Sequence, residues 1–398
     1  MQKKYFQMKK TSIFALLFCC FAGVFAQKND TTGFVFTTVK EIPVTSIKNQ
    51  NRSSTCWSFS ALSFLEAELL RLGKGEHDFA EMFVVHRTMM DRAVNYVRLH
   101  GESSFSPGGS FYDVMYCWKH YGIVPQQVMG GIMYGDTLHV HNELDKVAKG
   151  YIDAIAKSNL QKLTPVWKNG LSAIYDAYLG KIPEEFTFKN KKYTPKSYAE
   201  SFGLNMDDYI SLTSFSHQPF YSAFAIEVPD NWRNGLSYNL PLDELVKVIE
   251  TAINQGYAVA WAADVSEIGF SRKGVGVMPD ADKGAELTGS DMARWTGLSK
   301  DDRRAELTSR PLPEMEITQE MRQLAYDNWE TTDDHGMLIY GIANDQNGKP
   351  YFMVKNSWGM SGQYKGIWYI SKAFTAYKTI SIVVHKNAIP KDILKKIK

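Results

Sequence analysis

The feature that most constrains the fold of this 398-residue chain is a change in the spacing of its apolar residues. Near the start, the segment from Trp57 to Leu72 carries apolar side chains at helical intervals, and Gly73 ends it. After residue 334 the chain consists of short β-rich runs between turn residues, namely "HGMLIYGIA", "YFMVKNSW", "GIWYISK" and "TISIVVHK". Helices that precede an antiparallel sheet, without alternating with its strands, predict an α+β fold.

Between these two regions the sequence predicts further helices and one buried strand. Apolar periodicity and boundary residues indicate helices over residues 56–72, 79–99, 111–120, 142–156, 160–179, 242–253 and 319–329. The run "YAVAWAADV" predicts a buried strand, residues 180–241 are rich in loops, and residues 280–313 are polar. A chain of this length can bury a large core, and its 44% apolar and 22% charged residues are typical of a folded protein.

The first 26 residues have the pattern of a secretory signal. Lysines at positions 3 to 10 precede an apolar run, Ile13–Phe25, and the small residue Ala26 follows. The pattern predicts a signal peptide over residues 1–26 that is cleaved near Ala26, with residues 27–398 as the mature chain. The protein is therefore expected to be exported, as a periplasmic or secreted bacterial protein.

A lipoprotein anchor at Cys19 or Cys20 is the less favoured alternative, because the bulky Phe18 precedes the first of these cysteines. No later segment is long and apolar enough for a membrane helix, so no stable membrane association is expected. Removing residues 1–26 takes four lysines and no acidic residue, which leaves 41 basic against 43 acidic residues. This near balance of charge argues against a nucleic-acid partner.

Two cysteines, Cys56 and Cys117, remain in the mature chain, which is too few for a disulfide framework. A single bridge between them is one alternative. Cys117 lies among large apolar residues on a predicted helix, which indicates a packed core thiol. Cys56 instead lies at the first turn of its helix, where the dipole and free N–H groups favour a thiolate. Cys56 is thus a candidate nucleophile, and a buried structural thiol is the other interpretation.

A thiolate nucleophile needs a basic partner, and His335 is the histidine whose surroundings distinguish it. It begins a β-rich run, and the hairpin loop "NDQNGKP" joins this run to the one that leads into Asn356. Antiparallel pairing across that loop brings Asn356 within a few residues of facing His335. An asparagine oxygen can orient an imidazole and fix its tautomer, and Trp358 can shield that bond from water.

Gln50 lies six residues before Cys56, and its side-chain amide, with the Cys56 backbone N–H, can stabilise an oxyanion. A metal site at "HVH", residues 139–141, is an alternative that no further cluster of ligands supports. Neither a metal nor a cofactor is therefore expected.

The segments "NQNRSSTCWSFSA", "DDHGMLIYGIA" and "VKNSWG" resemble, in this order, the Gln, Cys, His and Asn segments of papain-like cysteine peptidases. The segments "SPGGSFYDVMYCWKHYGIVP", "YLGKIPEEF" and "YAVAWAADVSE" are similar to those of the bleomycin hydrolase/aminopeptidase C branch. The resemblance extends from about Val44 to Ile389 and implies a papain-like two-lobe fold with a large insertion. It implies one helical lobe and one lobe that resembles an antiparallel β-barrel.

The resemblance also implies roles for individual residues. Cys56, on the helical lobe, would be the nucleophile, and Gln50 the oxyanion donor. His335 and Asn356, on the β lobe, would be the base and its orienting partner. The substrates implied are peptides, the activity is that of an aminopeptidase, and the assembly is a homo-oligomer, a ring-like hexamer.

The chain departs from the family pattern in several places. Cys56 and His335 are 279 residues apart, against about 130–150 in papain-type chains, which suits an insertion over about residues 122–240. Ser54 stands where papain has glycine. Members of the branch are usually intracellular, whereas this chain carries the predicted signal. The long C-terminal arm of the branch, which reaches into the cleft, is shortened here to "AIPKDILKKIK".

Three classes of function remain open. The first is a thiol peptidase, either an aminopeptidase or, because of the shortened arm, an endopeptidase. The second is another thiol acyl-transfer enzyme such as a cell-wall amidase, which usually has His or Asp where this chain has the Asn of "KNSWG". The third is an inactive binding protein, against which the intact set of Cys56, His335 and Asn356 argues.

Overall fold

The computed structural model describes residues 33–280 and 299–397. The helices in these ranges are α1 (Cys56–Arg71), α2 (Glu81–Arg98), α3 (Phe111–His120), α4 (Asn142–Ala156), α5 (Trp167–Leu179), α6 (Pro195–Glu200), α7 (Leu242–Asn254), α9 (Lys300–Leu307), α10 (Gln319–Asp327), α11 (Lys372–Lys378) and α12 (Lys391–Leu394), with 3-10 turns η1 (Met206–Asp208) and η3 (Lys386–Ala388). The strands are β1 (Thr37–Glu41), β2 (Phe186–Phe188), β3 (Lys191–Tyr193), β4 (Tyr209–Thr213), β5 (Ala223–Ala225), β6 (Leu236–Asn239), β7 (Val259–Ala263), β8 (Phe270–Ser271), β9 (Val275–Gly276), β10 (His335–Asn344), β11 (Pro350–Lys355), β12 (Ile367–Ser371) and β13 (Thr379–His385). The predicted α+β class is confirmed.

The helices predicted from periodicity occur close to their expected positions. The predicted ranges 111–120 and 142–156 coincide with α3 and α4. The helix predicted over 160–179 begins only at Trp167. Pro165 precedes this start, and a proline disfavours helical backbone at the residue before it, so the helix starts after the proline.

One large sheet forms the second half of the fold, with the strand order β5-β6-β4-β13-β7-β10-β11-β12-β9-β8 and with β1 also paired to β10. Its central pairs, from β4–β13 to β11–β12, are antiparallel. Among the strands that the structure describes, the order runs as an open path and no pairing of β5 with β8 closes it. The β lobe thus has the predicted antiparallel character without a closed barrel.

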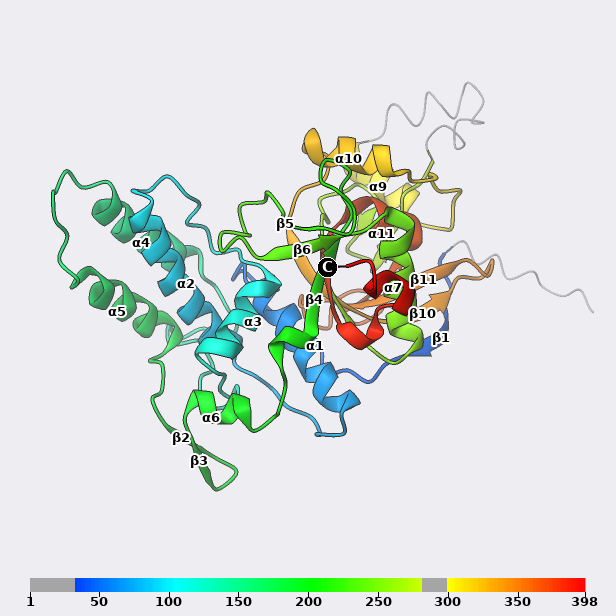
Figure 1. Ribbon diagram of the computed structural model, residues 1–398. Coiled ribbons are helices and arrows are strands. Elements are labelled where there is room, and N and C mark those ends of the chain that lie inside the picture. Colours follow the sequence, from blue (N-terminus) through cyan, green and yellow to red (C-terminus); the bar gives the residue numbers. More distant parts are fainter. Residues whose placement is uncertain (1–32, 281–298, 398) are drawn as a thin grey trace, which may run out of the picture. The chain divides into compact units, whose positions relative to one another are not determined.

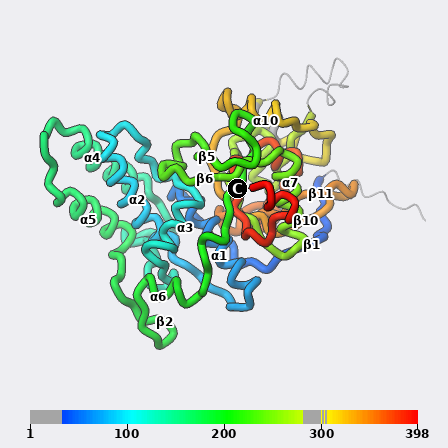
Figure 2. The backbone as a smooth tube through the Cα atoms, in the orientation of Figure 1, coloured from blue at the N-terminus to red at the C-terminus, as the bar shows by residue number. Residues whose placement is uncertain are grey.

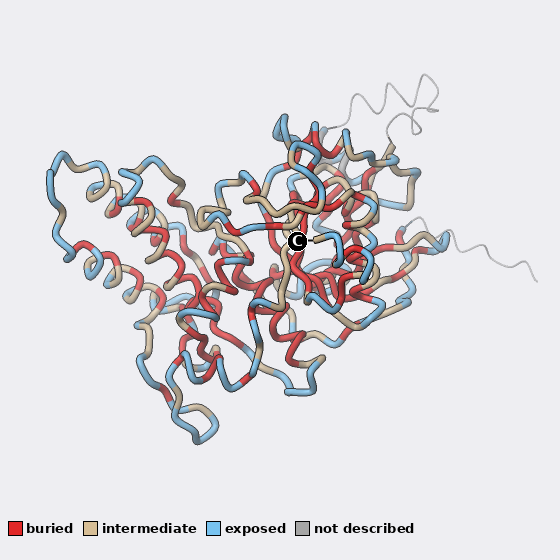
Figure 3. The backbone as a smooth tube through the Cα atoms, viewed as in Figure 1, coloured by how far each residue is buried: buried red, intermediate tan, exposed pale blue. Residues whose placement is uncertain are grey.

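Helices cover both faces of this sheet. Along β7 the side chains alternate, so that Ala260 joins the core shared with α1 and Trp261 joins the core shared with α7. Figures 1 and 2 show α2, α4 and α5 grouped on one side, and α7 and α11 together on the other. The buried residues in Figure 3 are concentrated along α1 and along the central strands, where the helices and the sheet meet.

The range predicted as an insertion, residues 122–240, contains both additional helices and part of the main sheet. Its first portion forms α4, α5 and the separate hairpin of β2 and β3. Its last portion was expected to be rich in loops, but it contributes β4, β5 and β6 to the main sheet. These strands have three to five residues and incomplete burial, so their sequences lack a strong apolar pattern. The extent of the insertion stays a prediction.

A cluster of buried charges joins the two halves of the fold. Lys48 Nζ lies 2.9 Å from Glu66 on α1 and 2.7 Å from Glu81 at the start of α2. Glu66 also accepts a 2.5 Å hydrogen bond from Thr45 Oγ1, which in turn accepts a 2.9 Å bond from Lys355 Nζ on β11. Burial lowers the pKa of Lys48, but Glu81, Glu66 and Asp78 outweigh it and raise this pKa well above the usual value. We call Lys48, Glu66, Glu81 and Lys355 the buried charge cluster.

Replacing Glu66 with glutamine should strongly destabilise the fold. The substitution removes a buried carboxylate that accepts bonds from Lys48, Thr45 and the Phe79 N–H, and it leaves cationic groups underpaired. Breaking a buried ion pair by removing one partner typically costs about 3–5 kcal/mol, and we expect Glu66→Gln to lower the free energy of unfolding by this order. Chemical denaturation followed by circular dichroism measures it.

The matched control is Glu76→Gln, because Glu76 is exposed in the loop between α1 and α2. This variant should lie within about 0.5 kcal/mol of wild type. A loss below about 1 kcal/mol for Glu66→Gln would show that the buried charge cluster does not hold the two halves together.

Candidate active site

Cys56 is the first residue of α1. The turn before the helix places Ser54 in the left-handed region, with φ of 56°, where a glycine is usually favoured. This accounts for the glycine that papain has at the corresponding position. The backbone N–H groups of Trp57 and Gly336 favour the thiolate and lower the pKa of Cys56, although burial outweighs them. The nucleophile candidate therefore lies at a helix start and against the first residues of β10.

Gly336 allows β10 to approach α1 closely. A Cβ atom at this position would lie 2.7 Å from Ser60 Oγ and 3.5 Å from the Cys56 carbonyl oxygen, both on α1. Any side chain here would therefore push the strand away from the helix. The residue before it, His335, begins β10 and pairs with Ala263 of β7. The glycine thus brings the imidazole-bearing end of β10 to the N-terminus of α1.

His335 is oriented by two residues beyond β11. Its Nε2 lies 2.8 Å from Asn356 Oδ1, and this oxygen also accepts a 2.7 Å bond from the Ser357 N–H. The Trp358 ring stacks on the imidazole with centroids 4.7 Å apart. Both His335 and Asn356 are almost fully buried, so water cannot compete for their bond. With Nε2 bonded to Asn356, Nδ1 is the ring nitrogen left for another partner.

Gln50 is buried and is hydrogen-bonded to Ser357, the residue after Asn356. Its backbone N–H donates to the Ser357 carbonyl at 2.8 Å, and its Oε1 accepts a 2.6 Å bond from Ser357 Oγ. The side-chain oxygen is thereby occupied, which leaves the NH₂ group of the amide to donate elsewhere. Gln50 is not among the residues that line the cavity described next.

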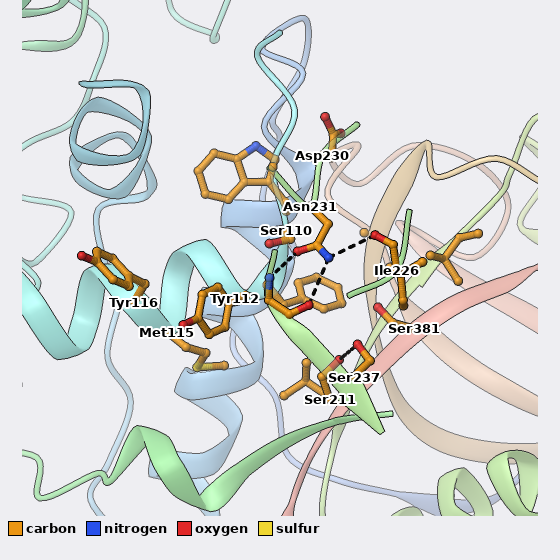
Figure 4. A pocket seen from close by; sticks show the side chains of 18 of the residues that line it. Ser110, Tyr112, Met115, Tyr116, Ser211, Ile226, Asp230, Asn231, Ser237 and Ser381 are labelled. Atoms are coloured by element: carbon orange, nitrogen blue, oxygen red, sulfur yellow. Dashed lines mark hydrogen bonds between the residues drawn. The ribbon is translucent and has the colours of Figure 1, made fainter. Parts of the chain in front are cut away.

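Cys56 and His335 both line a cavity of about 420 Å³. One wall comes from α1 and α3, with Trp57, Tyr112 and Met115, and the opposite wall from β4, β6 and β13. Figure 4 shows this space with Ser211 and Ser237, which share a 2.7 Å hydrogen bond, and with Asn231. The Asn231 amide bonds the Ile226 and Gly235 carbonyls at 3.1 and 3.0 Å and so fixes the loop that forms the rim. We call this space the cysteine cavity.

The surroundings of the cysteine cavity disfavour an isolated charge on either reacting group. Burial raises the pKa of the Cys56 thiol to about 12, and the Asp333 and Asp230 carboxylates add to this rise. Burial lowers the pKa of His335 to about 4, although its bond to Asn356 opposes the shift. A proton passed from Cys56 to His335 creates two opposite charges together, and their attraction offsets part of both desolvation costs.

The structure decides several alternatives that the sequence left open. Cys56 and Cys117 are free thiols, so the bridge between them is absent from the described chain. His139 and His141 lie with ring centroids 5.8 Å apart, and burial lowers the pKa of each to about 4. The described ranges contain no group of three or more metal-ligating side chains around them or elsewhere.

Sequence reasoning missed three groups of residues at this site. Gly336 acts by letting β10 approach α1, and Ser357 acts through its backbone and side-chain bonds to Gln50 and Asn356. Their only signal in the sequence was that they directly follow His335 and Asn356. Asp230 lies in the region taken as insertion, so nothing in the sequence connected it with Cys56. Asp333 had a signal, because it lies two residues before His335, and alternate residues of an extended segment share a face.

Comparison with known proteins places this fold among the cysteine peptidases. A crystal structure of PepW from Lactobacillus rhamnosis superimposes with a TM-score of 0.65 over 91% of this chain and 84% of its own, at 19% identity. A sequence model of the Peptidase C1-like family matches residues 77–283 and 313–398. The chain belongs to this family and is a cysteine-type peptidase of papain-like fold.

Two curated relatives match along nearly the whole length. Aminopeptidase G of Lactobacillus delbrueckii subsp. lactis is 25% identical over 403 aligned residues, which cover 90% of this chain and 84% of the relative. Aminopeptidase C of Streptococcus thermophilus is 22% identical over 391 aligned residues, which cover 87% and 82%.

The prediction of an exported, periplasmic or secreted protein is contradicted by these comparisons. The relatives are aminopeptidases C and G, of the branch whose members are usually intracellular. The prediction depended on residues 1–26, which lie outside the described residues. An apolar run of 10–14 residues is an ambiguous signal, because runs of this length also occur in core helices and interfacial segments. None of the described helices is long and apolar enough to cross a membrane.

Replacing His335 with alanine should slow alkylation of Cys56 by iodoacetamide near pH 7 by on the order of 100-fold or more. Without the imidazole, burial and two carboxylates leave a thiol whose pKa is raised to about 12, so thiolate forms only in alkaline solution. The variant's alkylation rate should therefore climb steadily above pH 9. Mass spectrometry of the Cys56 peptide gives the rates.

His77→Ala is the matched control, since His77 lies in the loop after α1 and is not among the described residues that line the cysteine cavity. This variant should alkylate at the wild-type rate. Equal rates at pH 7 for wild type and His335→Ala would mean that His335 is not the group that accepts the Cys56 proton.

Proposed function

We propose that this protein hydrolyses peptide bonds with Cys56 as the nucleophile, His335 as the base and Asn356 as the residue that orients the imidazole. The observation that carries the proposal is the 2.8 Å bond between His335 Nε2 and Asn356 Oδ1, together with the presence of Cys56 and His335 in one cavity. A nucleophile, a base and an orienting group in this order form the functional unit of thiol and serine acyl-transfer enzymes.

The reaction follows from these positions. The Cys56 proton passes to His335, and the sulfur attacks the scissile carbonyl carbon to give a tetrahedral oxyanion. The Cys56 backbone N–H, at the free start of α1, and the NH₂ group of Gln50 donate to this oxyanion. His335 then gives its proton to the departing amine as the C–N bond breaks. Water, deprotonated by His335, attacks the thioester and releases the acid and the Cys56 thiol.

We further propose that the substrates are peptides with a free amino terminus. The support comes from the relatives named aminopeptidase C and G, which align with nearly the whole chain. The hexamer that the family resemblance implies stays a prediction, which sedimentation of the purified protein tests.

One observation favours the alternative, an endopeptidase. The C-terminal segment packs on α7 through buried Ile393, and Lys396 Nζ lies 2.6 Å from Glu244 Oε1 of that helix. Among the described residues, none after Val383 lines the cysteine cavity. In that part of the chain, the tail does not occupy the cavity as the arm of the resembling branch does.

Replacing Cys56 with alanine should reduce kcat for a fluorogenic aminoacyl amide by on the order of 10⁶-fold, because it removes the nucleophile of a unit whose members act together. The circular dichroism spectrum should not change. Cys117→Ala is the control, since Cys117 is packed in the core away from the cavity, and it should stay active.

A thiol-directed epoxide should label wild type once, at Cys56, and labelling should abolish hydrolysis. Activity above a hundredth of wild type in Cys56→Ala would contradict the assignment of the nucleophile. Labelling at Cys56 without loss of hydrolysis would also contradict the assignment of Cys56 as the nucleophile.

Removing residues 395–398 should leave the preference between free and N-acetylated peptides unchanged. The described residues of this segment contact α7 and lie outside the cysteine cavity, so their loss opens no space beside Cys56. The ratio of kcat/KM values for one fluorogenic peptide in its free and acetylated forms provides the measurement. A truncated enzyme that gains activity on the acetylated form would show that the tail acts in the cavity.

A further inference from the structure

An aminopeptidase needs an anionic group close to its nucleophile. In a substrate cleaved after its first residue, the α-nitrogen is two bonds from the carbonyl carbon that the sulfur attacks, a distance of about 2.5 Å. The group that recognises the α-ammonium must therefore lie within a few ångströms of Cys56. The tail packs on α7 in the described chain, so the residues that line the cysteine cavity are the candidates.

Carboxylates outnumber lysines in this cavity. Among its described lining residues are Asp207, Asp230, Asp333 and Asp334, against a single lysine, Lys119. Lys119 is already engaged, because its Nζ lies 2.6 Å from Asp207. The charges of Asp333 and Asp230 are the two that act on the Cys56 thiol. The region beside the nucleophile is thus negative and attracts cations.

The carboxylates differ in how far the protein already satisfies them. Asp334 accepts bonds from the Val265 and Ser266 N–H groups at 2.9 and 3.2 Å. Asp230 accepts a 3.3 Å bond from Ser106 Oγ and lies 3.7 Å from Arg92. Asp333 has no hydrogen bond and no ion pair with any residue of the described ranges.

An unpaired carboxylate in such a position needs an explanation. Asp333 is half-buried, faces the cavity and lies near two other carboxylates. Burial and the charges of Asp230 and Asp334 raise its pKa to about 7, which is the result expected when an anion lacks a counter-ion. A half-buried carboxylate that lines the cavity of the nucleophile and has no paired cation can accept a cationic group from a bound molecule.

We propose that Asp333, supported by the charge of Asp230, binds the α-ammonium group of the substrate's first residue and so makes the enzyme require a free amino terminus. The proposal rests on the proposed function, because it takes Cys56 as the nucleophile. An acetylated substrate loses the positive charge and adds an acyl group at the place where the carboxylate lies. Asp333 is a residue that determines specificity, and the described part of the tail does not contribute to it.

Binding of the ammonium also changes the nucleophile. In the free enzyme, Asp333 and Asp230 oppose formation of the Cys56 thiolate. A bound ammonium neutralises this opposition, so a substrate with a free amino terminus favours the reactive form of Cys56. An acetylated substrate leaves the opposing charges in place.

The test compares free and N-acetylated forms of several aminoacyl coumarin amides on wild type and on Asp333→Asn. We expect the substitution to lower kcat/KM for the free forms by about 100-fold, the size of a lost charge-assisted contact, and to change the acetylated forms by less than threefold. Asp333→Glu, which keeps the charge, should recover activity on the free forms to within tenfold of wild type. Asp243→Asn makes the same charge change on the exposed start of α7, away from the cavity, and should behave as wild type.

A second readout separates binding from folding. Asp333→Asn should speed the alkylation of Cys56 by iodoacetamide, because one of the charges that oppose the thiolate is gone. A damaged fold, by contrast, would slow the alkylation of Cys56 and impair Asp333→Glu as much as Asp333→Asn.

The outcomes distinguish this inference from the proposed function. If wild type requires a free amino terminus and Asp333→Asn keeps that requirement, the role of Asp333 is wrong while the peptidase assignment stands. If Asp333→Asn lowers kcat/KM equally for free and acetylated substrates, the proposed role of Asp333 is also wrong. If wild type cleaves both forms equally well, the aminopeptidase proposal and the role of Asp333 both fail. If Cys56→Ala retains hydrolysis, the proposed nucleophile itself is wrong.

Discussion

The buried charge cluster is the interaction on which the rest of the structure depends. Lys48 lies two residues before Gln50, Glu66 is on the helix that begins with Cys56, and Lys355 directly precedes Asn356. The same group of ions therefore fixes three segments that are remote in sequence and that carry the proposed reacting groups. Charges removed from water tolerate little displacement of their partners, because any unpaired charge is costly. The geometry of the site thus depends on a network that takes no part in the chemistry.

Electrostatics explains how a half-buried thiol and a buried imidazole can be both stable and reactive. Burial keeps each group neutral on its own, and Asp333 and Asp230 add to the cost of a thiolate. Beside Cys56, Asp230 lies 3.7 Å from Arg92, whereas Asp333 has no paired cation within the part of the chain that the structure describes. If Asp333 binds the substrate's ammonium group as proposed, recognition of the substrate and activation of the nucleophile have one physical origin.

The sequence predicted the helices and the pairing of His335 with Asn356 because each depends on local information. Helical periodicity located α3 and α4, and the hairpin loop brought the two residues together, where the structure has their 2.8 Å bond. Asp230 and the strands β4 to β6 could not be predicted in this way. Their positions follow from contacts between distant segments, and their sequences carry no strong pattern of their own. The prediction of export was wrong because a short apolar run occurs in core helices and interfacial segments as well as in signal peptides.

The position of β13 in the sheet has a consequence for how the protein folds during its synthesis. In sequence this strand follows all the other described strands, yet it lies between β4 and β7, with Ile382 paired to both Leu212 and Trp261. Until β13 is made, the sheet has a gap between β4 and β7, although α1, which carries Cys56, has already been synthesised. The pairing at the centre of the sheet therefore forms late, because it depends on a segment that follows both Cys56 and His335 in the chain.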